Sequence, residues 1–202
     1  MVAGGSGQRF GRPKQYEQLA GRTVLDWAVD AARASSDGVV IVLPAADAGG
    51  AHTVAGGATR SESVRNGLAL VPPSAGVVCI HDAARPFAGP DLFATVISAV
   101  RSGADGAIPG VPVTDTVKVI DAEGVVRSTP DRATLVAVQT PQAFRADILR
   151  RAHAERGEGT DDAALVERLG GRVVVVQGDP ANRKITLPDD LQWARDQVEG
   201  RR

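Results

Sequence analysis

The chain begins with a stretch rich in glycine and positive charge, GGSGQRFGRPKQ at residues 4–15. Glycine lets a backbone approach a ligand closely and turn its N–H groups toward anionic oxygens. Arg9 and Lys14 add mobile positive charge that could follow a phosphate as charge develops on it. The stretch is therefore a candidate phosphate loop, although taken alone it fits an exposed glycine turn with solvated basic side chains equally well.

Two familiar phosphate-binding patterns do not match this stretch. A dinucleotide fingerprint, G-x-G-x-x-G, would use Gly5 and Gly7, but its last position is Phe10. A P-loop needs glycine directly before its lysine, and Pro13 precedes Lys14. These mismatches disfavour a hydride-transferring dehydrogenase and a P-loop kinase.

A second constellation, HDAARP at residues 81–86, directly follows the apolar run VVCI. An acidic residue at the carboxyl end of a parallel strand lies on the edge where open α/β sheets bind ligands. Asp82 could hold Mg²⁺ there beside nucleotide phosphates, and Arg85 could meet an anionic substrate. The alternatives are a helix cap for Asp82 and a surface ion pair for Arg85, and we expect His81 to make structural hydrogen bonds.

The elements that must position these residues follow an α/β pattern. Short Val- and Ile-rich runs predict strands at 39–43, 77–80, 106–110, 135–138 and 172–176, and segments of helical period predict helices at 23–34, 61–70, 90–102, 146–156, 161–169 and 188–198. The continuous apolarity of the runs indicates strands covered by helices on both faces. Thr23 and Ser61 are predicted helix caps, and Pro188 is a predicted first-turn residue. Polar residues after these strands bring Arg60, Arg132 and Lys184 to one potential anion-binding rim.

One segment departs from this rhythm. TVKVIDAEGVVRSTP, residues 116–130, alternates apolar and polar residues around DAEG and predicts a β-hairpin. We expect one domain over residues 1–202 with this hairpin as an arm at about 112–132. Because the apolar face of such an arm needs a covering surface, a second subunit is the simplest partner, and we expect a homodimer.

Composition excludes several other classes of protein. Aromatic residues make up 3% of the 202 residues and the formal net charge is −1, which argues against a nucleic-acid binder. No apolar stretch approaches the roughly 18 residues that a membrane span needs, and no signal peptide is visible. The expected location is the cytoplasm.

A series of motifs runs in order along nearly the whole chain: G-S-G-x-R-x(4)-K-Q, G-G-x-x-R-x-x-S, H-D-A-A-R-P, D-T-x-K, Q-T-P-Q-x-F, T-D-D-A and N-x-K-I-T. This series resembles the 2-C-methyl-D-erythritol 4-phosphate cytidylyltransferases. The resemblance implies a Rossmann-like α/β fold with a mostly parallel sheet, helices on both faces and a β-hairpin arm for dimerisation. It further implies a nucleotidyltransferase of non-mevalonate isoprenoid biosynthesis that uses CTP, a sugar-alcohol phosphate and Mg²⁺. Relatives that act on ribitol 5-phosphate share most of these motifs, so that substrate or another sugar phosphate stays open, as does a non-catalytic nucleotide-binding module.

The resemblance also implies a role for each matching residue. Arg9, Lys14, Arg132 and Lys184 are the implied catalytic residues, with Arg9 and Lys14 around the triphosphate. CTP would be bound by Ala3, Gly4, Gly5, Gly7, Gly57, Ala58, Arg60, Ser63 and Asp82, of which Asp82 would also hold the metal. The sugar phosphate would face Arg85, Thr116, Arg132, Thr140, Thr160 and Lys184, with Thr116 and Arg132 reaching the neighbouring subunit's site.

The sequence departs from this family pattern at two places. Ala58 stands where relatives can carry an acidic residue, so only backbone recognition is expected there. Relatives also have a hydrophobic strand before the glycine loop, whereas only MVA precedes Gly4. The first strand is therefore apparently truncated: either it is reduced to a stub, or the true start of the protein lies upstream of Met1, and we favour the second interpretation as a hypothesis.

Overall fold

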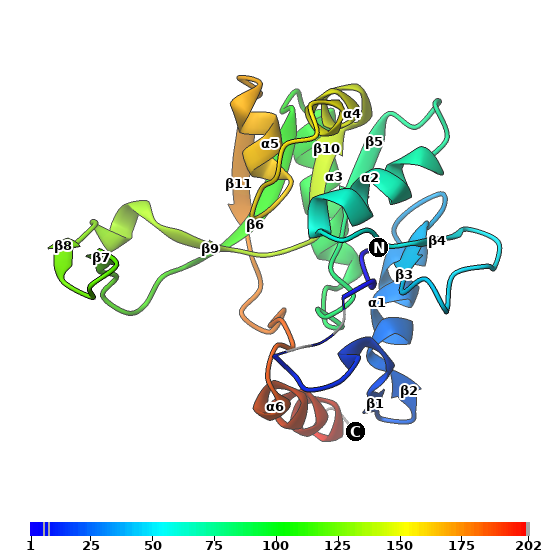
Figure 1. The fold of residues 1–202 in the computed structure, drawn as a ribbon, viewed down its shortest axis with the longest axis horizontal. Helices are drawn as coiled ribbons and strands as arrows, with labels where there is room; N and C mark the ends of the chain where they lie inside the picture. Colours follow the sequence, from blue (N-terminus) through cyan, green and yellow to red (C-terminus); the bar gives the residue numbers. More distant parts are fainter. Residues whose placement is uncertain (6, 8, 201–202) are drawn as a thin grey trace.

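The computed structural model, which describes residues 1–5, 7 and 9–200, has a central sheet between two layers of helices and a long hairpin that extends away from them (Figure 1). The strands are β1 (Gln18–Leu19), β2 (Arg22–Thr23), β3 (Ile41–Leu43), β4 (Thr53–Ala55), β5 (Val77–Ile80), β6 (Gly106–Pro112), β7 (Val119–Ile120), β8 (Val126–Ser128), β9 (Val136–Val138), β10 (Gln142–Arg145) and β11 (Val173–Gln177). The helices are α1 (Val24–Arg33), α2 (Arg60–Ala69), α3 (Pro90–Arg101), α4 (Ala146–Ala154), α5 (Ala163–Arg168) and α6 (Pro188–Glu199), with short 3-10 turns at Lys14–Tyr16 and Arg132–Thr134.

The sheet is mostly parallel, as predicted. β3 pairs in parallel with β4, and β6 pairs in parallel with β11. Val2 joins the two parts because it forms parallel bridges to Val42 in β3 and to Asp82 just after β5. β10 lies antiparallel between β5 and β6. The spatial order is therefore β4, β3, Val2, β5, β10, β6 and β11, with β10 antiparallel within this order and β9 added antiparallel at the end of β6.

Helices cover both faces of this sheet. Apolar residues of α2, α4 and α5, such as Leu68, Leu149 and Val166, pack on one face against β5, β6 and β10. On the other face, α3 packs against β6 and β10, and α1 packs against α3. This arrangement explains the continuous apolar runs of the sequence. None of the helices in the described part of the chain is long and apolar enough to cross a membrane.

The strand predictions were correct at three positions and wrong in part at two. The run at 135–138 contains β9, but all three residues of β9 are exposed, because this strand lies antiparallel on the end of β6 at the base of the hairpin. The prediction of a strand covered on both faces was wrong for this run, and also for the run at 172–176, because β11 is an edge strand on which Val175 is exposed. Within the described residues, four strands were not predicted, because β1, β2 and β4 have only two or three residues each and QAFR of β10 carries two polar ends.

Each predicted helical segment contains a helix. Thr23 caps α1, because its hydroxyl accepts the N–H of Asp26 at 3.0 Å and the Asp26 carboxylate accepts the N–H of Thr23 in return at 3.0 Å. Pro188 begins α6. The prediction of Ser61 as a cap was wrong, since Thr59 accepts the N–H of Glu62 at 3.1 Å and Ser61 lies buried within the first turn of α2.

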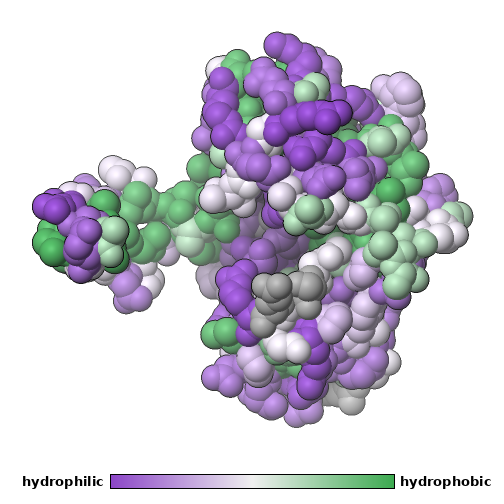
Figure 2. All heavy atoms as spheres, in the orientation of Figure 1, coloured by the Kyte–Doolittle hydropathy of each residue, from purple (hydrophilic) through white to green (hydrophobic). Residues whose placement is uncertain are grey.

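The hairpin predicted at 116–130 is formed by β7 and β8, which pair antiparallel (Figure 1). Several large apolar side chains on or near it are exposed, namely Val119, Ile120, Val125, Val126, Val136 and Val138. Figure 2 shows hydrophobic atoms along the whole length of this arm. Its role in dimerisation stays a prediction at this point.

Candidate active site

The glycine loop leaves the sheet at its centre. The N–H of Val2 donates to the carbonyl of His81 at 2.7 Å, and the N–H of Ala3 donates to the carbonyl of Val42 at 2.8 Å. The segment from Gly4 onward therefore starts at the carboxyl edge of the sheet, where open α/β sheets bind ligands. Within the described residues, the short stretch around Val2 occupies the position of the first strand that the sequence predicted to be truncated.

A pocket of about 500 Å³ opens at this edge. Eleven of the predicted site residues line it: Ala3, Gly4, Gly5, Gly7, Arg9, Lys14, Gly57, Ala58, Arg60, Asp82 and Lys184. They come from the glycine loop, from the loop after β4, from the start of α2, from the end of β5 and from the segment before α6. The topology thus brings together motifs that are widely separated in the sequence.

Two features fix the conformation of the glycine loop. One is a close backbone contact that only glycine permits, and the other is a hydrogen bond from a buried side-chain amide. Gly7 has φ +70°, and a Cβ built there would lie 1.9 Å from the carbonyl oxygen of Arg12. The Gln15 side chain, which is buried, donates to the carbonyl of Gly5 at 3.3 Å. Gly4 lies against Gly56, so that the loop packs closely on the segment after β4. Ser6 and Gln8 lie outside the described residues.

The cations of the pocket repel one another. Burial of Lys14, together with the nearby charges of Lys184 and Arg9, lowers the pKa of the Lys14 ammonium. Asp82 and Asp190 oppose this effect only in part. An anionic ligand in the pocket would relieve this repulsion, which is the electrostatic signature expected of a phosphate site.

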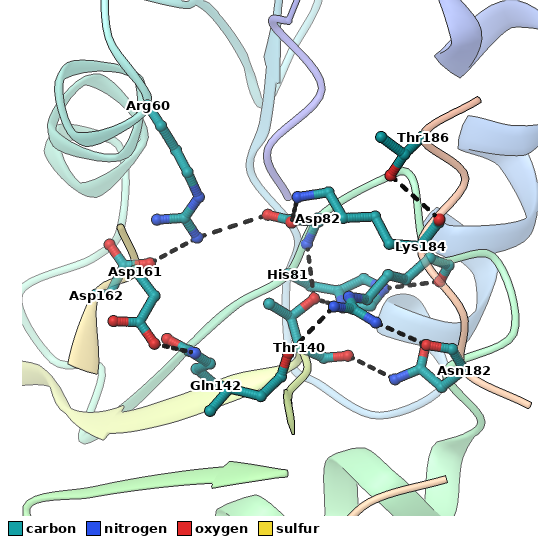
Figure 3. A network of polar contacts seen from close by, with 12 residues as sticks. Arg60, His81, Asp82, Thr140, Gln142, Asp161, Asp162, Asn182, Lys184 and Thr186 are labelled. Carbon is teal, nitrogen blue, oxygen red and sulfur yellow. Dashed lines mark hydrogen bonds and ion pairs between the residues drawn. The ribbon is translucent and has the colours of Figure 1, made fainter. Parts of the chain in front are cut away.

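Asp82 lies between two cations (Figure 3). Its Oδ2 accepts from the Lys184 ammonium at 2.6 Å, and its Oδ1 lies 3.5 Å from the Arg60 guanidinium. Although burial opposes ionisation, Lys184 and Arg60 lower the pKa of Asp82 to about 2, so the carboxylate is charged at neutral pH. Arg60 also pairs with the buried Asp162 at 2.8 Å. Its Nη1 is buried without a partner in the described part of the chain, which leaves a donor for a ligand.

Behind Asp82, three buried polar groups are linked by hydrogen bonds (Figure 3). The Thr140 hydroxyl accepts the N–H of Asp82 at 3.1 Å and donates to Nδ1 of His81 at 2.9 Å. Nε2 of His81 then donates to the carbonyl of Arg85 at 3.2 Å. Burial lowers the pKa of His81 to about 4, so the ring is neutral and fixed in this tautomer. His81 therefore has the structural role that the sequence suggested.

The segment after β4 has its N–H groups already bonded. Gly57 donates to the hydroxyl of Ser63 at 3.0 Å, and Ala58 donates to the carboxylate of Glu62 at 2.7 Å. Ser63 itself does not line the pocket. In the described part of the chain no hydrogen bond to the carbonyls of Gly57 and Ala58 is found, so acceptors rather than donors are available there for a ligand.

The remaining predicted substrate residues lie away from the pocket lining. Arg85 donates to the carbonyls of Asn182 at 2.7 Å and Val138 at 3.3 Å. The hydroxyl of Thr140 is buried, as described above, and Thr160 is exposed in the loop before α5. Thr116 and Arg132 are exposed on or beside the arm, where Arg132 donates to the carbonyl of Thr114 at 2.8 Å.

Two residues of the site were not singled out by sequence reasoning. Asp162 is fully buried and forms an ion pair with Arg60, and the side chain of Gln15 donates a hydrogen bond to the backbone of the glycine loop. Both belong to quoted motifs, T-D-D-A and K-Q, so their motifs were found but their contacts were not. A buried charge that acts through another residue leaves no pattern of its own in the sequence.

A glycine loop with basic side chains at the carboxyl edge of a mostly parallel sheet is typical of α/β proteins that bind nucleotides. The model of the family IspD, 2-C-methyl-D-erythritol 4-phosphate cytidylyltransferase, matches residues 1–199, and the chain belongs to this family.

Individual relatives agree with this assignment. The chain is 47% identical over 212 residues to the 2-C-methyl-D-erythritol 4-phosphate cytidylyltransferase of Rhodococcus jostii (strain RHA1), with 98% of this chain and 93% of the relative covered. It is 44% identical over 215 residues to the enzyme of the same name from Nocardia farcinica (strain IFM 10152), with 100% and 93% covered. Among solved structures, the enzyme of this name from Thermus thermophilus has a TM-score of 0.84 at 35% identity, with 98% of this chain and 97% of that chain covered.

Proposed function

We propose that this chain transfers the cytidylyl group of CTP to 2-C-methyl-D-erythritol 4-phosphate, giving CDP-methylerythritol and pyrophosphate in non-mevalonate isoprenoid biosynthesis. The observation that carries the proposal is the convergence of Arg9, Lys14 and Lys184 on one pocket beside Asp82, in a chain that belongs to this family. A triphosphate is the ligand that such a group of mutually repelling cations suits best.

The reaction needs no general base. The phosphate of the sugar alcohol is already an anionic nucleophile, and one of its oxygens attacks the α-phosphorus of CTP in line. The bond from that phosphorus to the bridging oxygen breaks, and pyrophosphate leaves with its electron pair. The protein then contributes positioning and electrostatic stabilisation.

Four side chains are proposed to carry this stabilisation. Arg9 and Lys14 embrace the triphosphate together with the backbone of Gly4, Gly5 and Gly7, and Lys184 faces the sugar phosphate. Arg132 is proposed to act from the arm of a second subunit, with Thr116. Arg85, Thr140 and Thr160 complete the proposed sugar-phosphate side. Thr140 would act by positioning Asp82, whose N–H it accepts, and Arg85 by positioning the segment of Asn182, whose carbonyl accepts from it.

The base is proposed to be read by the segment after β4. Cytosine carries an exocyclic amino group, which is a hydrogen-bond donor. The carbonyls of Gly57 and Ala58 are acceptors, while their N–H groups are bonded to Ser63 and Glu62. An amino group therefore suits this segment better than the carbonyl of uracil would. Ala3 and Arg60 complete the proposed CTP contacts.

Asp82 is proposed to hold Mg²⁺. Among the described residues there is no group of three or more His, Cys, Asp or Glu side chains that could cage a metal alone. Mg²⁺ commonly takes one or two carboxylates and completes its shell with substrate phosphates and water. A single ionised carboxylate in the nucleotide pocket fits this mode. When bound there, the cation would neutralise charge on the triphosphate.

Release of pyrophosphate tests the proposed reaction. The purified chain is incubated with Mg²⁺, each of the four nucleoside triphosphates, and either 2-C-methyl-D-erythritol 4-phosphate or ribitol 5-phosphate. We expect release with CTP and methylerythritol phosphate that exceeds every other combination. Preference for ribitol 5-phosphate would reassign the acceptor, and no release with any pair would contradict catalysis.

A second copy of this chain is the proposed partner of the arm. Groups of exposed apolar side chains mark interaction sites, and the arm exposes Val119, Ile120, Val125 and Val126 on or beside its two strands. Thr116 and Arg132 lie on or beside this arm and do not line the pocket of their own chain. We infer that the arm carries them to the pocket of the neighbouring subunit.

Mixing two inactive variants tests this exchange. Lys14→Ala damages a chain's own pocket, and Arg132→Ala damages the residue that the arm supplies. If Arg132 acts in the neighbouring subunit, one site of each mixed dimer is intact, and an equal, randomly assorted mixture should regain about one quarter of wild-type activity. Each variant mixed with itself is the control. If the mixture regains nothing, Arg132 acts within its own chain or not at all.

A further inference from the structure

A second groove lies between helices α2 and α4, outside the pocket described above. It has a volume of about 490 Å³ and is lined by Arg65, Leu68, Ala69, Arg150, His153, Ala154 and Arg156. None of these residues lines the nucleotide pocket. The proposed function therefore gives this groove no role.

Three arginines make the groove cationic. Within the described residues, the Arg156 guanidinium has no hydrogen-bond or ion-pair partner and is exposed. Arg150 donates to the carbonyls of Val71 and Pro72, each at 3.0 Å, and neutral carbonyls leave its charge uncompensated. Arg65 lies 3.4 Å from the carboxylate of Glu158, which compensates one of the three charges.

The wall of the groove also contains a buried imidazole. His153 is 2% exposed, and its Nε2 lies 3.0 Å from Oδ1 of the buried Asp162. Because Nε2 faces a carboxylate, it is the nitrogen that carries the ring proton. Its Nδ1 is buried and has no hydrogen-bond partner in the described part of the chain. With the proton on Nε2, Nδ1 is a hydrogen-bond acceptor, so the partner that it lacks is a donor, such as the hydroxyl of a phosphate group that keeps one proton.

We propose that this groove binds a small ligand through a phosphate or diphosphate group, and that its occupancy reaches the nucleotide pocket through Asp162 and Arg60. Phosphate oxygens match the planar fork of an arginine, and the two uncompensated arginines, with Arg65 beside them, suit a doubly charged anion. Leu68, Ala69 and Ala154 add an apolar floor, so the ligand can carry a short apolar part beside its anionic group.

The contacts that connect the two sites are continuous. His153 contacts Oδ1 of Asp162, and Oδ2 of the same carboxylate lies 2.8 Å from Arg60. Arg60 lines the nucleotide pocket and lies 3.5 Å from Asp82 (Figure 3). A ligand that donates a hydrogen bond to Nδ1 of His153 therefore acts, through the imidazole ring, on the same carboxylate that pairs with Arg60. This coupling, unlike the binding itself, rests on the proposed function.

Calorimetric titration with inorganic pyrophosphate, without Mg²⁺, tests the binding. We expect two sites per wild-type chain, one in the nucleotide pocket and one in the groove. Arg156→Glu should weaken the groove site at least tenfold and leave one site. Arg151→Glu is the matched control, because Arg151 is an exposed arginine of α4, the helix that Arg156 closely follows, and it does not line the groove. Lys14→Ala should weaken the other site and spare the groove.

Three results would overturn the proposal: a single site in the wild type, equal affinities in the two charge reversals, or loss of all binding in Lys14→Ala. Because Arg156 is exposed and unpartnered among the described residues, its reversal should leave the fold intact, which a thermal melt checks. Titration requires no turnover, so binding in the groove can stand even if the chain proves inactive.

Inhibition of the CTP reaction by pyrophosphate tests the coupling. With both sites occupied, inhibition against CTP should be mixed, because one pyrophosphate competes with CTP and the other acts through Arg60. Arg156→Glu should make the inhibition purely competitive, while Arg151→Glu should keep it mixed. Purely competitive inhibition of the wild type would show that the groove does not communicate with Arg60.

Discussion

Replacing Lys14 with alanine is expected to lower kcat by about 100- to 1,000-fold, the loss typical for a group that stabilises charge in the transition state. Lys14 lies in the pocket with Arg9 and Lys184, where burial and these neighbouring charges lower the pKa of its ammonium. A cation in this position gains most when negative charge on the reacting phosphates is greatest, so kcat should fall more than the affinity for CTP. Steady-state release of pyrophosphate at varied CTP gives both quantities.

Arg12→Ala is the matched control for this substitution. Arg12 lies in the same loop, is exposed and pairs with Glu17, and it does not line the pocket. Its loss should change kcat less than about twofold, as for a surface ion pair. Because Lys14 is repelled by its neighbours, its replacement should not lower the melting temperature. A correctly folded Lys14→Ala variant with near-normal turnover would exclude Lys14 from the transition state.

The residues of the pocket could be predicted because their positions follow from the sheet. Asp82 lies two residues after the end of the apolar strand β5, the glycine loop starts from Val2 at the sheet centre, and Gly57 lies two residues after the end of β4. The carboxyl ends of parallel strands meet at one edge, so motifs at such ends converge even when they are distant in sequence. Lys184 joins them because the N–H of Ile185 donates to the carbonyl of Ala84 at 2.8 Å.

Other features could not be predicted because they depend on what surrounds a residue. The apolar run at 135–138 has the composition of a buried strand, yet β9 is exposed at the base of the arm. β10 carries Gln142 and Arg145 at its ends, and its polarity concealed a strand that is buried over three of four residues. Thr59 and Ser61 are both good cap residues, and the contact of Thr59 with Glu62 decides between them.

The ion pairs that Asp82 and Asp162 form could not be predicted from the sequence either. The motifs that contain Arg60, Asp82 and Asp162 each predict a charged residue near the edge of the sheet. They do not predict that Arg60 lies between the two carboxylates. In the structure burial alone would lower the pKa of the Arg60 guanidinium, but Asp162 and Asp82 outweigh this effect and raise it. Asp82 therefore has two tasks, since it fixes Arg60 and Lys184 and is also the proposed metal ligand.

Replacing Asp82 with asparagine is expected to impair both tasks while preserving the size of the side chain. Lys184 and Arg60 would lose the carboxylate that they share, and Mg²⁺ would lose its proposed ligand. We expect kcat/KM to fall by about 100-fold or more, the order of loss for a removed electrostatic stabiliser. Pyrophosphate release at varied Mg²⁺ should also show a higher Mg²⁺ requirement. Asp37→Asn, at an exposed aspartate outside the pocket, is the matched control.

The same substitution should change how stability depends on pH. The pKa of Asp82 is lowered from 3.8 to about 2 in the folded chain, so its charged form stabilises the fold. The shift corresponds to about 2 kcal/mol. This contribution is present above about pH 4 and is lost as the pH falls toward 2, because the acid then becomes protonated in both states. Urea unfolding should therefore show Asp82→Asn less stable than the wild type at pH 7, with a difference that narrows from pH 4 downward. A difference that stays constant over this range would show that the ion pairs of Asp82 do not stabilise the fold.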